Sequence, residues 1–338
     1  PPPGSQPPTP RQPAMEFRPG VIPLRPLRLG DLYGAVVKAI RGNVAATMGL
    51  AFVTTLVFLV PTTALGAWIA SLETADFTSS EAAFPVAGTL SSYVPAFGTW
   101  LSSILLTGFV AWVIGQAVMG RRVTAGQTWE GTRGRLPQVI GATLVTTLAL
   151  VLSLAAVLVL PVLAIVSAVQ SGGESGVGAA VALGVLGALA ALVLVLFIST
   201  RLAFVTASVV LEQLSVRAGL ARSWRLTGGT QFWRVLGIRI LTGVIVGFAA
   251  QILSIPLSIL GVVGVLGTGD SGDLFIWQAV TAGLSGLITG ALTTPFTAGV
   301  DALLYVDQRI RREGFDVQLI TAAQQDAART WPGATGRP

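Results

Sequence analysis

The segment VIGATLVTTLALVLSLAAVLVLPVLAIVSAV at 139–169 decides the fold, because it carries no charged residue over its whole length. A helix rises about 1.5 Å per residue, so this segment is longer than the roughly 30 Å hydrocarbon core of a bilayer requires. Further apolar runs of sufficient length lie at about 44–70, 96–119, 178–200, 235–267 and 275–300. Together the runs predict an all-α integral membrane protein with six transmembrane helices.

Charged residues divide the connections between these runs into two classes. Three connections carry only acids: Glu73, Asp76 and Glu81 in the first, Glu174 in the second, Asp270 and Asp273 in the third. The alternating connections and both termini are rich in Arg and include the single lysine, Lys38. Because segments rich in Arg and Lys stay on the cytoplasmic side of a membrane, we expect a multi-pass protein of the plasma membrane with both termini in the cytoplasm.

The composition agrees with a membrane protein and excludes several kinds of chemistry. The chain is 52% hydrophobic and 11% charged, with a mean hydropathy of +0.76 and a net charge of +6. An excess of basic residues at the membrane surface favours anionic lipids of the inner leaflet as partners, and we expect no nucleic acid. The chain has neither Cys nor His, which removes the usual metal ligands and the Ser-His-Asp triad. We therefore expect no catalytic activity, no metal and no cofactor.

Proline divides a predicted N-terminal tail from the membrane domain. Residues 1–26 begin PPPGSQPPTPRQP, and proline at this density favours a disordered or polyproline-like segment. This tail is either a solvated tether or a docking site for a partner that binds Pro-rich segments. We expect the six-helix domain to cover 27–316 and a second cytoplasmic tail to cover 317–338.

Short segments with helical periodicity precede the apolar runs. In 214–227 the apolar residues Val216, Leu220 and Trp224 recur every four residues, which predicts a helix lying in the membrane interface. The segment 31–42 shows similar periodicity, and 121–135 shows it more weakly. The candidate residues for contact with lipid headgroups are Arg217, Arg222, Trp224, Arg225 and Trp233. Alternatively, these helices cap the transmembrane bundle and bind nothing else.

The chain also contains an internal repeat. RGNVAATMGLAFVTT at 41–55 aligns without a gap on RGRLPQVIGATLVTT at 133–147, and a fainter third copy covers 216–243. Each unit consists of an interfacial helix followed by a helical hairpin, so three units would form parallel repeats. Chance similarity between Ala- and Val-rich segments is the alternative.

Small and charged residues within the runs are the remaining site candidates. Gly243 and Gly247 in the fifth run, and Gly286 and Gly290 in the sixth, recur every four residues and predict helix-packing faces. Arg201 and Asp301 reach similar depths near the cytoplasmic boundary, where they could form an ion pair. The alternatives are that each side chain extends separately to water, or that both belong to a substrate or ion site.

Three stretches resemble a known family: IPLRPLRLGDLYGAVVKAIRGNVAATMGL at 22–50, VVLEQLSVRAGLARSWRLTGGTQFWRVLGI at 209–238 and ALLYVDQRIRREGFD at 302–316. They are similar to actinobacterial multi-pass proteins known by the name glycerophosphoryl diester phosphodiesterase membrane domain. The resemblance implies a membrane module without the separate phosphodiesterase domain, so no catalytic residue carries over.

From these patterns we expect a membrane scaffold or lipid-interacting module of the cell envelope, in contact with anionic lipids and with envelope proteins. The alternative function is transport of a small solute or a lipid, which the charged residues Arg201 and Asp301 and the prolines within the helices motivate.

Overall fold

The structure, a computed structural model, describes residues 20–23, 25–71, 86–171, 174–268 and 273–324. Its regular elements in these ranges are all helical, and six stretches of helix are long and apolar enough to cross a membrane. The predicted class, an all-α multi-pass membrane protein, is confirmed. The elements are α1 Leu29–Gly42, the π-helical turn η1 Ala45–Gly49, α2 Leu50–Ser71, α3 Val86–Val118, α4 Ala125–Arg133, α5 Leu136–Ser171, α6 Glu174–Arg201, α7 Val205–Leu211, α8 Val216–Leu226, α9 Gln231–Thr268, α10 Asp273–Glu313 and α11 Phe315–Gln324.

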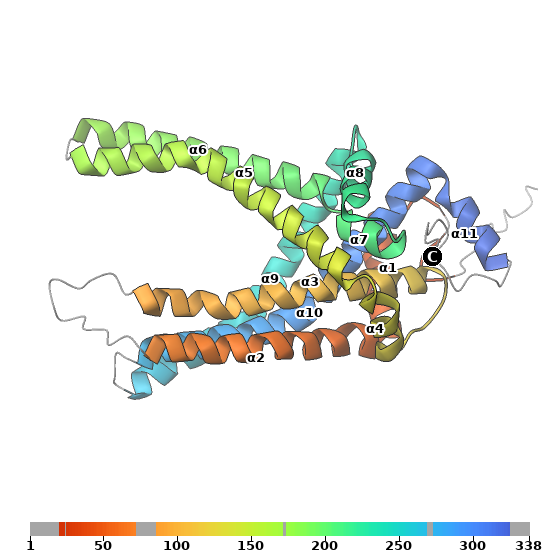
Figure 1. The fold of residues 1–338 in the computed structure, drawn as a ribbon, viewed down its shortest axis with the longest axis horizontal. Coiled ribbons are helices and arrows are strands. Elements are labelled where there is room, and N and C mark those ends of the chain that lie inside the picture. Colours follow the sequence, from red (N-terminus) through yellow and green to blue (C-terminus); the bar gives the residue numbers. More distant parts are fainter. Residues whose placement is uncertain (1–19, 24, 72–85, 172–173, 269–272, 325–338) are drawn as a thin grey trace, which may run out of the picture.

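The order of elements follows the repeat seen in the sequence. A short helix precedes each of the hairpins α2–α3, α5–α6 and α9–α10, namely α1, α4 and α8 in turn. Within each hairpin the two helices pack on one another, and α10 also packs along α2 and α3. The hairpin α5–α6 diverges from this group, as Figure 1 shows, and touches it mainly near one end, where α5 contacts α3 and α6 contacts α9.

The helices α1, α4, α7, α8 and α11 gather at one end of the molecule, which we call the charged end (Figure 1). Many of the largest fully buried side chains lie here, among them Leu32, Phe204, Tyr305 and Phe315. Elsewhere α5, α6 and α9 expose their apolar side chains over most of their length. An exposed apolar surface of this kind is stable in hydrocarbon. The charged end instead buries its apolar side chains, as a water-soluble domain does.

Ordered residues lie at the inner end of each predicted tail. Within the N-terminal tail predicted for 1–26, Ile22 is fully buried, and the Val21 amide donates to the Ala117 carbonyl at 3.2 Å. Within the C-terminal tail predicted for 317–338, α11 continues to Gln324. In both segments a few apolar residues next to a polar stretch pack into the core. Residues 1–19 and 325–338 lie outside the described part.

The predicted glycine packing holds for α10 and is wrong for α9. A Cβ atom at Gly286 would lie 2.8 Å from the Thr99 hydroxyl oxygen of α3, and one at Gly290 would lie 3.6 Å from the Thr55 methyl group of α2. These glycines therefore let α10 approach its neighbours closely. At Gly243 and Gly247 an added Cβ meets no atom within 4 Å. Both glycines are exposed, and α9 meets α10 at Gly261 and Gly264 instead.

Candidate functional site

The short helix α7 determines how the charged end is built. In sequence its residues continue the apolar run of α6, but a turn at 202–204 separates the two helices. Val205 and the stretch 207–211 are buried, and α7 contacts α3, α5, α8 and α10. Glu212, the residue that ends this helix, is consequently carried into the protein interior, where its carboxylate needs partners.

A buried network of charges surrounds Glu212. Its Oε1 accepts a hydrogen bond from Arg222 Nη2 at 2.9 Å and from the Tyr305 hydroxyl, and lies 3.2 Å from Arg309 Nε. Glu313 pairs with the same two arginines, at 2.7 Å from Arg222 Nη2 and 3.2 Å from Arg309 Nε. The network contains two carboxylates and two guanidinium groups, so its formal charge is zero. It ties α8 to α10 and to the end of α7.

Burial by itself lowers the pKa of the Arg222 guanidinium, but the hydrogen bonds that it donates to Glu313 and Glu212 outweigh this effect and raise the pKa above its ordinary value. Arg222 therefore keeps its charge at every physiological pH. The guanidinium carbon of Arg309 lies 3.6 Å from the centre of the Phe315 ring. This cation–π contact fixes the start of α11 against the network.

The prediction that Arg222 contacts lipid headgroups is wrong. Its side chain is 15% exposed and lies in the network, because α8 turns a different face to the protein than the apolar stripe indicated. The buried residues of α8 are Gly219, Ser223 and Leu226. Ser223 Oγ accepts from the Phe204 amide at 3.1 Å and donates to the Arg201 carbonyl at 2.7 Å. Gly219 and Ser223 are small enough to let α8 approach α7 closely. Trp224, which belongs to the predicted apolar stripe, is 48% exposed.

A second buried cluster holds the N-terminal segment in place. Asp307 is fully buried, and its Oδ1 accepts from the Leu27 amide at 2.8 Å. Arg234 and Arg311 pair with Asp307 at 3.2 and 2.9 Å, and both also donate to the Leu27 carbonyl, at 2.7 and 3.0 Å. Sequence reasoning missed this cluster. The periodic signal that could have indicated it is the spacing of four residues between Asp307 and Arg311 on one face of α10.

The predicted ion pair between Arg201 and Asp301 is wrong, because each residue has a nearer partner. Asp301 Oδ1 lies 3.4 Å from Arg239 Nε. The guanidinium carbon of Arg201 lies 4.8 Å from the ring centre of Trp224, and also faces the rings of Phe197 and Phe232 at 5.2 and 5.5 Å. Arg239 is a lone charge within the apolar part of α9, and this feature of the sequence could have identified it as the partner of Asp301.

Other predicted interface residues do face outward. Arg217, Trp224, Arg225 and Trp233 are all exposed, Trp233 by 72%, and neither of these arginines forms an ion pair with a described residue. We call these four residues the basic surface. The nearby carboxylates do not neutralise these arginines, because they pair with other arginines instead; they are Glu212, Asp301, Asp307 and Glu313. Positive charge consequently remains available on α8.

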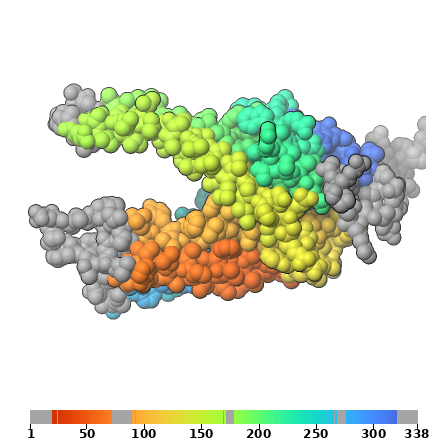
Figure 2. All heavy atoms as spheres, in the orientation of Figure 1, coloured from red at the N-terminus to blue at the C-terminus, as the bar shows by residue number. Residues whose placement is uncertain are grey.

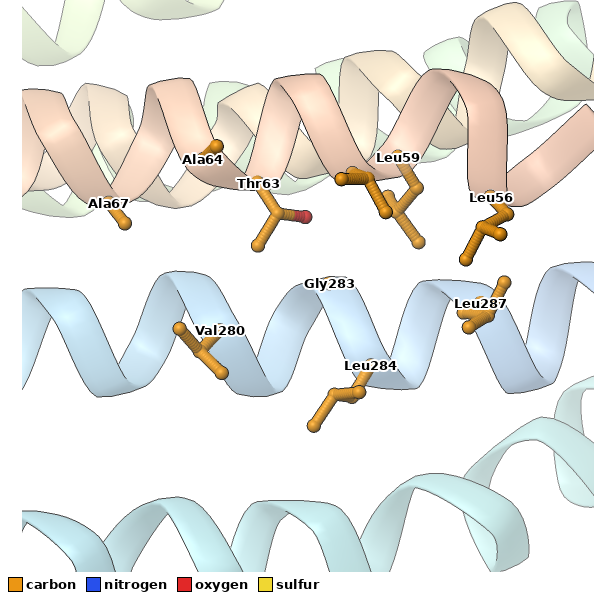
Figure 3. Close-up of a pocket in the computed structure, with 10 residues that line it drawn as sticks. Leu56, Leu59, Thr63, Ala64, Ala67, Val280, Gly283, Leu284 and Leu287 are labelled. Atoms are coloured by element: carbon orange, nitrogen blue, oxygen red, sulfur yellow. The ribbon is translucent and has the colours of Figure 1, made fainter.

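Two hollows differ in chemistry. A groove of about 360 Å³ between α2 and α10 is lined by aliphatic side chains, with Thr63 of α2 opposite Gly283 of α10 (Figure 3). This groove lies within the spanning segments, so acyl chains would fill it. A second hollow of about 630 Å³ lies between the end of α3 and α4, and is lined by charged and polar residues that include Arg121, Arg122 and Glu130.

No group of three or more metal-binding side chains occurs among the residues that the structure describes. No family model, no curated protein and no solved structure matches this chain. The family resemblance drawn from the sequence therefore stays a prediction, and the function has to be argued from the site.

Proposed function

We propose that this protein is a lipid-interacting membrane module of the cell envelope, without catalytic activity, that binds the headgroups of anionic lipids through its charged end. The observation that carries the proposal is the division of charges at this end. Buried carboxylates neutralise the arginines of the interior, while Arg217 and Arg225 are exposed and form no ion pair with a described residue. Trp224 and Trp233 are exposed as well.

The chemistry of these residue types supports a membrane surface as the partner. Tryptophan favours the boundary between hydrocarbon and water, and each Arg near an anionic surface contributes about 1 kcal/mol to attraction. The positive charge also supports the predicted orientation, in which both termini face the inner leaflet of the plasma membrane. The buried networks hold α8 in a defined position. The basic surface would therefore lose little conformational entropy on binding lipid.

The test compares the full chain reconstituted in nanodiscs of neutral phosphatidylcholine with discs containing increasing phosphatidylglycerol. We expect the anionic lipid to raise the melting temperature of the wild-type protein. In the double variant Arg217→Gln/Arg225→Gln this rise should shrink. Ala221 is exposed on the same helix, so Ala221→Gln adds the same amide without removing charge and should behave like the wild type. An equal rise in all three proteins would contradict the proposal.

A second candidate function, transport of a lipid or small solute, is favoured by one observation. Figure 2 shows the molecule deeply hollowed between the hairpin α5–α6 and the helices α2 and α3. A transporter would open and close this hollow, whereas a static module would not. Val57 of α2 and Val193 of α6 are exposed, and the chain has no Cys. Spin labels at Val57→Cys and Val193→Cys should give one distance distribution in nanodiscs for a static module and two for a transporter.

A further inference from the structure

The polar hollow between α3 and α4 is bounded by two helices that pack closely on one another. Trp112 and Gln116 lie in the last two turns of the membrane span that ends at Val118, which places the hollow at the level of lipid headgroups. The opposite wall is α4, where a Cβ at Gly131 would lie 2.5 Å from the Trp112 ring. Only glycine permits this contact, so α4 rests directly on the indole. We call this hollow, of about 630 Å³, the headgroup pocket.

The loop that carries its arginines is fixed at several points. Gly120 has a φ of 79°, which reverses the chain directly after α3. The Arg121 amide then donates to the Gln116 carbonyl at 2.9 Å, and the Val123 amide donates to Asn43 Oδ1 at 2.8 Å. The following helix begins with a capping box between Thr124 and Gln127. Arg121 and Arg122 are therefore presented by an ordered backbone, which reduces the entropy lost on binding.

Four polar side chains of the pocket form no side-chain hydrogen bond or ion pair with another described residue. Arg121, Arg122 and Glu130 line it and form no ion pair there. Gln116 is 9% exposed, yet its side-chain amide forms no hydrogen bond with any described residue. Its amide lines the hollow and is free to form a hydrogen bond with a ligand that enters it.

We propose that the headgroup pocket binds a phosphate group that carries a neighbouring ammonium group, as in the headgroup of phosphatidylethanolamine. Arg121 and Arg122 would bind the phosphate oxygens, for which guanidinium groups have matching geometry. Gln116 would donate to the same phosphate, and Glu130 would accept from the ammonium. A phosphate without an amine would leave the Glu130 carboxylate facing a like charge. The inference rests on the proposed lipid-interacting function and adds a zwitterionic ligand class, bound at a site separate from the basic surface.

The experiment measures lipid retention by native mass spectrometry on the detergent-purified full chain, with phosphatidylethanolamine, phosphatidylglycerol and phosphatidylcholine at equal concentration. We expect the wild type to retain phosphatidylethanolamine in preference to the others. Arg121→Gln/Arg122→Gln should weaken this binding about tenfold or more, or about 1.4 kcal/mol. Arg133 is exposed at the end of α4 and does not line the pocket, so Arg133→Gln is the matched control and should retain the preference.

Glu130→Gln tests the ammonium half of the site. Glu130 is exposed, so this variant should fold even if the double arginine variant does not. It should lose the preference for phosphatidylethanolamine over phosphatidylglycerol while keeping affinity for phosphate. Soluble O-phosphoethanolamine distinguishes the sources of the ligand: competition at low millimolar concentration identifies the headgroup alone as sufficient, and lipid binding without competition identifies the intact lipid.

Two results would overturn the inference. Arginine variants that fold and bind like the control would show that the phosphate binds elsewhere, and an unchanged preference in Glu130→Gln would remove the ammonium from the proposal. A wild-type protein that retains none of the three lipids would instead contradict the proposed function itself. A loss of anionic-lipid stabilisation confined to Arg217→Gln/Arg225→Gln, with a pocket insensitive to substitution, would leave the function standing and remove this site.

Discussion

The sharpest test of the charged end is Glu212→Gln, which removes one charge from the buried network without creating a cavity. The carboxylate is 8% exposed and has three partners, Arg222, Arg309 and the Tyr305 hydroxyl. Glutamine has nearly the same shape and can still accept one hydrogen bond. The variant therefore isolates the electrostatic contribution of the network from its packing.

The expected loss of stability depends on the burial of Glu212 and on the ion pairs that remain in the variant. Removing one partner of a buried pair typically costs about 3–5 kcal/mol, because the other charge stays dehydrated. Here Glu313 still lies 2.7 Å from Arg222 and 3.2 Å from Arg309, which favours the lower limit of about 3 kcal/mol. Glu313 itself is 28% exposed. Glu313→Gln, the matched control, should cost only about 1 kcal/mol, as expected for a pair that water reaches.

The assay is unfolding of the full chain in mixed micelles with increasing dodecyl sulfate, followed by circular dichroism. The double variant Glu212→Gln/Arg309→Gln should lose less stability than the sum of its single variants, because it removes both charges of one pair. If Glu212→Gln unfolds within about 0.5 kcal/mol of the wild type, or no earlier than Glu313→Gln, the network does not stabilise the charged end as argued.

Three further predictions concern packing, pairing and topology. Gly286→Leu should destabilise the protein by about 1–3 kcal/mol through overpacking against Thr99, whereas Gly247→Leu, where the space is open, should unfold like the wild type in the same assay; equal losses would refute the packing account. In a double-mutant cycle Asp301→Asn should couple with Arg239→Gln by at least about 0.5 kcal/mol and not with Arg201→Gln, and the reverse result would restore the pair predicted from the sequence. In intact cells an impermeant thiol reagent should label Ser79→Cys and spare Ala221→Cys until the membrane is opened; labelling of Ala221→Cys from outside would invert the proposed topology.

The six spans and their hairpin order were predictable because they depend on local properties. An apolar run such as 178–200 is stable only across a membrane or buried in protein, whatever the rest of the chain does. The helix α6 extends this run by only a few residues at each end. The same holds for α1, whose buried residues Leu32, Val36, Ala39 and Ile40 follow the predicted periodicity. These features require no knowledge of which helices are neighbours.

The partners of the charged residues could not be predicted in this way. Arg201 and Asp301 have similar depths, but depth along the membrane normal does not specify which helix lies alongside, and the structure places Arg239 nearer. Arg222 looked exposed on a helical wheel, but Gly219 and Ser223 let α8 approach α7 on another face.

The sequence by itself thus determined the membrane class, the spans and the surplus of positive charge at one end. The tertiary structure decided which of those charges are neutralised. Glu212, Tyr305 and Arg222 come from three separate helical segments, and Leu27 meets Asp307 across 280 positions of the chain. The physical reason is that hydrophobic length is a property of a segment, whereas an ion pair in the interior depends on the packing of several segments at once.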